Sequence, residues 1–72
     1  MREVKIGKKY KHFKGNIMEV LYIAKDSETL KKVVVYKHGD EVWVRDYEMF
    51  NSLVDKEKYP DIKQQYRFEE IC

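Results

Sequence analysis

The feature that most constrains this fold is a run of three valines just ahead of a tight turn. Because β-branched side chains resist helix formation at χ1, Val33–Tyr36 predicts a strand. Residues 38–40, His-Gly-Asp, have the length and composition of a hairpin turn, and residues 41–46 then alternate apolar and polar or aromatic side chains. Two strands this close in sequence pair antiparallel, so residues 31–46 predict a β-hairpin.

Three further segments predict strands. Residues 8–13 alternate charged and aromatic side chains, as a half-buried strand does, and a Gly-Asn turn signal follows at 15–16. Residues 17–24 are apolar at both parities, which is typical of a strand covered on both faces or of a short buried helix; the flanking turns and β-branched content favour the strand. Residues 66–71 alternate again and can close the sheet as a last strand.

One segment changes to a helical period. Tyr47, Phe50 and Val54 are spaced i, i+3, i+7, which predicts a short helical turn near residues 46–54 with Asp46 as its N-cap. Residues 55–65 are charged and contain the only proline, so they predict a loop.

Together these elements predict an all-β fold, because the chain has no long helix to cover a flat sheet. About five short antiparallel strands can bury one face by curling into a small, partly open barrel of SH3 type, with the helical turn plugging one end. An open sheet with the helix across its face is the alternative. The length of 72 residues predicts a single domain, 1–72, in which we expect residues 1–7 to be a loose N-terminal segment.

Short motifs spread over the chain carry a family resemblance. They are Tyr10–Asn16, Val20-Leu21, Ile23-Ala24, Ser27–Thr29, Val34–Tyr36, Gly39-Asp40, Trp43–Arg45 and Met49-Phe50. In their order and near-spacing the chain resembles a bacterial domain-of-unknown-function family, serial number 1653, over about residues 8–71. The resemblance implies an SH3-like small barrel and supplies no catalytic residues. The chain departs from the family pattern at Asp26, where His is usual, and at Asp46, where Pro is usual.

Composition argues against several classes of protein. No apolar run approaches the roughly 20 residues of a membrane span, and no apolar segment suited to a signal peptide follows the basic N-terminus. The only cysteine is Cys72, so we expect no disulfide scaffold and a reducing, cytoplasmic location.

The residues that could carry chemistry do not form an enzyme's pattern. His12, His38 and Cys72 are the soft metal-ligand candidates, and they lie far apart, whereas zinc ligands come in closely spaced pairs. The hydroxyl cluster Ser27–Thr29 is best explained as a turn that satisfies backbone N–H groups. We therefore expect no metal, no cofactor and no enzymatic activity.

The best functional candidates are aromatic. Tyr10, Tyr36, Trp43 and Arg45 come from strands expected to be neighbours, and His12 is expected at the barrel rim. If the hairpin valines line the interior, the last three face outwards together, where an aromatic residue beside Arg marks a binding surface. The opposite parity puts the sole tryptophan in the core under the helical turn. The prediction is a module that binds a peptide or protein partner through these five residues, as a monomer or weak homodimer.

Charge asymmetry suggests an alternative partner. The net charge of +2 divides into +6 over residues 1–38 and −4 over residues 39–72. Such a division fits either a basic binding face or two halves that neutralise each other. The alternative function is weak nucleic-acid binding through the lysines of the first half, which are Lys8, Lys9, Lys11, Lys14, Lys31, Lys32 and Lys37.

Overall fold

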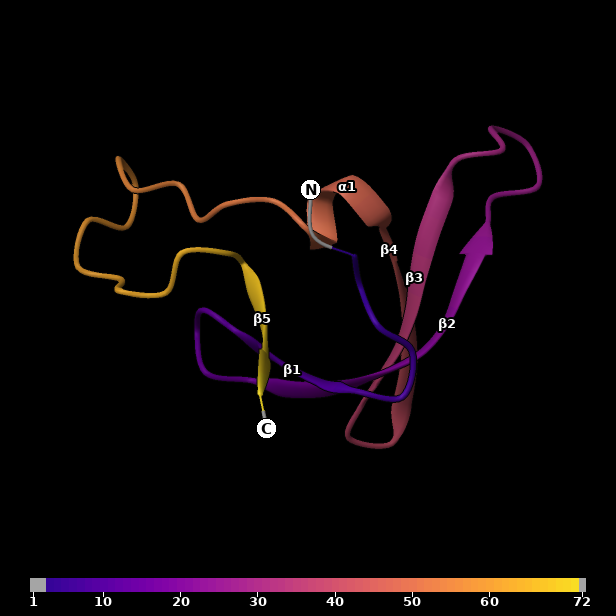
Figure 1. Cartoon of the computed structure of the whole chain (residues 1–72), viewed down its shortest axis with the longest axis horizontal. Helices are drawn as coiled ribbons and strands as arrows, with labels where there is room; N and C mark the ends of the chain where they lie inside the picture. Colours follow the sequence, from indigo (N-terminus) through magenta and orange to yellow (C-terminus); the bar gives the residue numbers. More distant parts are fainter. Residues whose placement is uncertain (1–2, 72) are drawn as a thin grey trace.

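The computed structural model describes residues 3–71, which form five strands and one short helix (Figure 1). The strands are β1 (Lys9–His12), β2 (Ile17–Lys25), β3 (Lys32–His38), β4 (Glu41–Asp46) and β5 (Phe68–Ile71), and the helix is α1 (Tyr47–Phe50). All strand pairs are antiparallel. The predicted all-β class, with five antiparallel strands and one helical turn, is confirmed, and residues 17–24 are strand.

The sheet order is β4-β3-β2-β1-β5, so β4 and β5 are its two edges. The long strand β2 pairs with β1 through its first residues and with β3 through the rest, and a β-bulge falls between Val20 and Tyr22. A bulge bends a strand and increases its twist, so it rolls the sheet and brings the edges towards each other. Within residues 3–71 no ladder joins β4 to β5, so the barrel is not closed, and the narrower SH3-like description stays a prediction.

Helix α1 is shorter than the predicted 46–54. Its N-cap is Asp46, whose carboxylate accepts hydrogen bonds from the backbone N–H groups of Glu48 (2.9 Å) and Met49 (3.3 Å). After Phe50 the chain becomes extended, because Leu53 forms a β-bridge with Tyr66 and so joins the loop before β5 instead of continuing the helix.

No helix among the described residues has the length and apolarity that a membrane crossing needs.

The core is a cluster of aromatic rings under α1. Phe50 is fully buried and stacks on Phe68 with ring centroids 4.1 Å apart and planes 6° apart. Tyr10 packs edge-on against Phe50 at 5.4 Å, and Tyr36 lies 5.9 Å from the same ring. The helical turn therefore plugs the sheet through one side chain, Phe50.

The inner face of β3 is the reverse of the one predicted. Val34 and Tyr36 are buried, whereas Val33 and Val35 are only half-buried on the other face. Alternation in the sequence predicts that alternate residues of β3 share a face, but it does not say which of the two faces points inwards. The ring of Tyr36 completes the aromatic cluster with Phe50, and Val34 together with this ring buries more apolar area than Val33 together with Val35 can.

The same reversal extends to β4. Val42 and Val44 are 59% and 62% exposed, so they do not line the interior as predicted. The register pairs Tyr36 with Trp43, and it pairs Val34 with Arg45. Directly paired residues share a face of the sheet, so Trp43 and Arg45 lie on the inner, concave side.

Hydrogen bonds hold Val4, Lys5 and Gly7 to the rest of the fold, which differs from the loose segment expected at 1–7. Val4 is buried, and its N–H donates to the Tyr47 hydroxyl at 3.0 Å. The Lys5 N–H donates to the Tyr10 hydroxyl at 2.9 Å, and the Gly7 N–H to the Val20 carbonyl at 2.8 Å. Residues 1–2 of that expectation lie outside the described residues.

Candidate functional site

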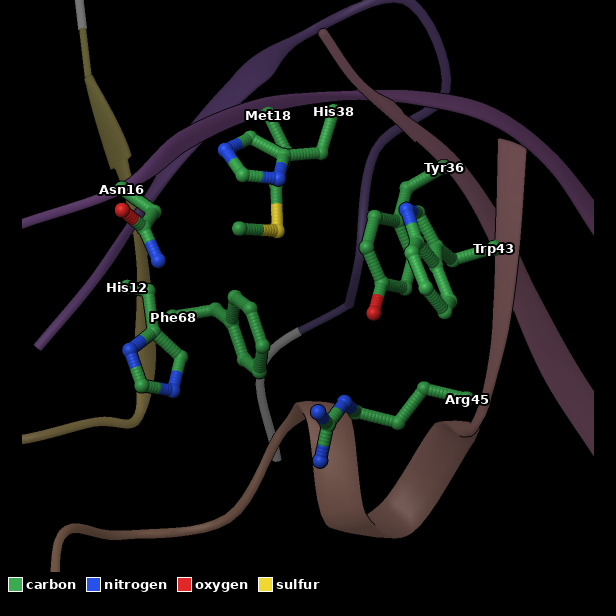
Figure 2. Close-up of a pocket in the computed structure, with 8 residues that line it drawn as sticks. All are labelled: His12, Asn16, Met18, Tyr36, His38, Trp43, Arg45 and Phe68. Carbon is green, nitrogen blue, oxygen red and sulfur yellow. The ribbon is translucent and has the colours of Figure 1, made fainter. Parts of the chain in front are cut away.

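A pocket of about 330 Å³ lies on the concave side, between the edge strands β4 and β5 (Figure 2). We call it the seam pocket. Other hollows in the surface have similar volumes, so its lining rather than its size distinguishes it. The lining combines aromatic rings, two imidazoles and one guanidinium, and it consists of His12, Asn16, Met18, Tyr36, His38, Trp43, Arg45 and Phe68.

Four of the five predicted binding residues meet in the seam pocket: His12, Tyr36, Trp43 and Arg45. The fifth, Tyr10, does not line it. Its side chain is 2% exposed within the aromatic core, and its hydroxyl accepts the Lys5 N–H, so its role is structural.

Trp43 sits at the rim of the pocket with 48% of its surface exposed. It lies opposite Tyr36 in the β3–β4 ladder and on the same side of the sheet. Neither predicted position fits, because the side chain does not face outwards and is not core under the helical turn. That core position belongs to Phe50, which the turn itself supplies.

Arg45 carries an unpaired charge into the pocket. Figure 2 shows its guanidinium extending from β4 towards Phe68 of β5, and it lies 5.3 Å from the centre of that ring. Its Nε is buried and has no hydrogen-bond partner within residues 3–71. The adjacent carboxylate of Asp46 is used as the cap of α1. A guanidinium in this state can donate hydrogen bonds to a carboxylate, phosphate or carbonyl oxygen of a ligand.

His12 lines the pocket with an imidazole ring whose neutral form is favoured. Its Nδ1 accepts the Lys14 N–H at 3.1 Å, which leaves the proton on Nε2. Burial, followed by the positive charges of Arg45, Lys14 and Arg67, lowers the pKa of His12 from its ordinary value. The ring also packs edge-on against Phe68 at 4.9 Å. The same positive surroundings that disfavour a charged His12 favour an anion beside it.

Four lining residues were not among the predicted binding residues: Asn16, Met18, His38 and Phe68. Phe68 shares a parity with Tyr66 in the predicted last strand, so its inward position could be suspected from alternation. The position of Phe68 beside Arg45 depends on the curvature of the whole sheet, and no local sequence pattern predicts that curvature.

Two of the metal candidates, His12 and His38, line the seam pocket, but no third ligand joins them among the described residues. In the part of the chain that the structure describes, no three His, Cys, Asp or Glu side chains are grouped to hold a metal ion. The predicted candidate Cys72 lies outside the described residues.

The hydroxyl cluster at 27–29 forms a turn in which the Asp26 carboxylate accepts hydrogen bonds from the N–H groups of Glu28 (2.8 Å) and Thr29 (3.1 Å).

The lysines of the nucleic-acid alternative are interleaved with acids. Glu19 of β2 lies between Lys9 and Lys37 on neighbouring strands, and Lys11 is paired across the ladder with Glu69. Another hollow collects Lys31 and Lys32 together with Asp46 and Glu48. Lys14 lies elsewhere, 5.6 Å from the ring of Tyr59. These positive charges therefore do not form one uninterrupted basic surface.

Comparison with known proteins gives one match. A family described as "Protein of unknown function (DUF1653)" matches residues 8–70. No curated protein and no solved structure matches the chain. Because the family description names no activity, function has to be argued from the site.

Proposed function

The chain belongs to the DUF1653 family, and from this premise we propose that it is a binding module that holds a peptide or protein partner in the seam pocket. One observation carries the proposal. Arg45 places among aromatic rings, at an opening in the sheet, a guanidinium whose buried Nε has no hydrogen-bond partner in the described part of the chain. Buried polar groups normally find partners, and an exception calls for an explanation such as an absent ligand.

The aromatic residues support the same function. Trp43 is half-exposed at the rim, and Tyr36 and Phe68 line the pocket beside it. Trp, Tyr and Arg are the residues that most often dominate binding energy at protein interfaces. A hollow of about 330 Å³ is at the small end for ligand pockets, which suits one or two side chains of a partner.

Binding fits the lining better than catalysis does. Among the described residues that line the pocket there is no carboxylate, Ser, Cys or Lys that His12 or His38 could activate.

The proposal also includes the fold type, the oligomeric state and the location: an SH3-like barrel that acts as a monomer or weak homodimer in a bacterial cytoplasm. The strand order, with β1 between β2 and β5, supports the first part, and the single cysteine supports a reducing compartment.

An array of short synthetic peptides tests the proposal, with Trp43, the only tryptophan, as a fluorescent reporter of the pocket. Three proteins are compared: the natural chain, Arg45→Gln, and Arg67→Gln as a matched control. Arg67 is also half-buried and also acts on His12, but it lines a different hollow.

We expect a subset of peptides to bind the natural chain and the Arg67→Gln variant equally, and to be lost from Arg45→Gln. Bound peptides should also change the fluorescence of Trp43. If no peptide binds, or if those that bind are indifferent to Arg45→Gln, the seam pocket is not a peptide site.

A further inference from the structure

Strand β4 is an edge with free backbone groups. In the described part of the chain it pairs with β3 alone. In an antiparallel pair the N–H and C=O of every second residue point away from the partner strand. No backbone hydrogen bond within residues 3–71 satisfies the outer side of residues 42–45.

This edge lacks most of the features that usually protect one, although the inward-pointing charge of Arg45 is such a feature. Natural edge strands are also blunted by lysine, proline, a bulge or a covering element. Residues 41–46 contain neither lysine nor proline, and their register with β3 runs without a shift. Val42 and Val44 are exposed on the convex face, and the backbone groups at the free edge of β4 can pair with a further strand.

The described residues place no negative partner in the pocket next to this edge. Of the three acids adjacent in sequence to pocket residues, Glu19 lies between Lys9 and Lys37 on neighbouring strands, and the other two are engaged in hydrogen bonds. Asp46 caps α1, and the Glu69 carboxylate accepts the N–H groups of Gln65 and Tyr66, each at 3.0 Å. None of the described residues lining the pocket is acidic, and the charge of Arg45 is reinforced by Arg67 and Lys14 around His12.

We propose that the partner is an extended acidic peptide segment, which adds to β4 as a further strand and places a carboxylate on the guanidinium of Arg45. The inference rests on the proposed function and names its ligand class. Alternate side chains of a strand point to one face, about 7 Å apart. A carboxylate on the concave face can therefore meet Arg45, while the next residue on that face packs against Trp43, which lies two residues along β4.

The charge requirement is tested with two soluble peptides, one of alternating Thr and Glu and one of alternating Thr and Gln. They differ only in charge. We expect the Glu peptide to quench or shift Trp43 fluorescence and to bind at least roughly tenfold more tightly than the Gln peptide, because a charge-assisted pair is lost in the latter. Arg45→Gln should reduce affinity for the Glu peptide by a similar factor, whereas Arg67→Gln should reduce it far less.

Strand addition is tested by N-methylation of the Glu peptide. In a strand, residues whose side chains share a face also share the edge to which their backbone groups point. Methylating the N–H groups of the Glu residues alone, or of the Thr residues alone, therefore blocks one edge at a time. We expect one methylated isomer to lose binding and the other to keep it.

Each other outcome overturns the inference in a distinguishable way. Equal binding of the Gln peptide refutes the acidic ligand class but leaves the module intact, and equal binding of both methylated isomers refutes strand addition. If no peptide of any charge binds, the proposed function fails as well. Tighter, Arg45-dependent binding of a single-stranded oligodeoxythymidine would assign the pocket to nucleic acid. Self-association in sedimentation that is abolished by Val44→Lys would assign the β4 edge to a second copy of the chain.

Discussion

Truncation of Trp43 tests the position of the only tryptophan. The side chain is 48% exposed, so about half of it is removed from water on folding. Truncating a fully buried aromatic residue costs about 3–5 kcal/mol, and the half-buried Trp43 should therefore cost about 2 kcal/mol as Trp43→Ala. For a domain of this size that corresponds to a fall of roughly 8–16 °C in melting temperature.

Phe50→Ala is the matched comparison. Phe50 is fully buried, stacks on Phe68 and is contacted edge-on by Tyr10, so its loss should cost at least about 3–5 kcal/mol. A 72-residue domain has only about 4–11 kcal/mol of stability in total. We therefore expect both variants to lose a substantial share of this stability, with a clearly lower urea midpoint for Phe50→Ala than for Trp43→Ala.

Urea denaturation followed by far-ultraviolet circular dichroism measures both variants, because Trp43→Ala removes the fluorophore. An unchanged slope against urea would show that the folded and unfolded states keep their difference in exposed area. If Trp43→Ala proves as costly as Phe50→Ala, then Trp43 is a core residue. The seam pocket would then lose its rim, and the reasoning about binding would be refuted.

Three further predictions concern pH, the helix cap and nucleic acid. Folding lowers the pKa of His12 from 6.5, so the folded state favours the neutral ring. The stability that depends on the neutral ring is complete above pH 6.5 and is lost as the pH falls through the lowered pKa. On acidification the urea midpoint should therefore fall less in the His12→Asn variant than in the natural chain. Asp46→Ala should cost about 1 kcal/mol in the same assay by removing the cap of α1, while Asp46→Asn, whose amide oxygen can still accept, should cost less; equal losses would show that the cap bonds are unimportant. Single-stranded oligonucleotides should bind only weakly at physiological salt, because lysines of the sheet face glutamates; tight binding that falls steeply in a salt titration would contradict this.

The strands could be predicted because their signals are local. The valine run and the turn at 38–40 lie within a single hairpin, and β3 and β4 form over the expected residues. The family resemblance is confirmed by a match over residues 8–70. The cap at Asp46 was predictable for the same reason, since a capping carboxylate acts only on residues two and three places ahead.

The inner face of the hairpin could not be predicted, because alternation defines two faces without ordering them. Tyr36 turns inwards owing to Phe50 and Phe68, which come from distant parts of the chain. The helix ends early for a similarly non-local reason, the bridge from Leu53 to Tyr66. The set Tyr36, Trp43 and Arg45 was nevertheless correctly grouped, since the parity that unites them is independent of which face is buried.

The β2 bulge connects the fold to the candidate site. Without extra twist at Val20–Tyr22 the sheet would lie flatter, and Arg45 of β4 would not reach the ring of Phe68 on β5. With complete closure, a ladder between β4 and β5 would pair both edges and leave no opening for the pocket between them. The observed sheet is neither flat nor closed. As far as residues 3–71 are concerned, it therefore has an unpaired edge at β4 and a buried Arg45 Nε without a hydrogen-bond partner. Leaving a buried donor unsatisfied costs about 1–3 kcal/mol, a substantial part of a small domain's stability. A strand carrying a carboxylate would satisfy the edge and the guanidinium together, which is why we assign both features to one ligand.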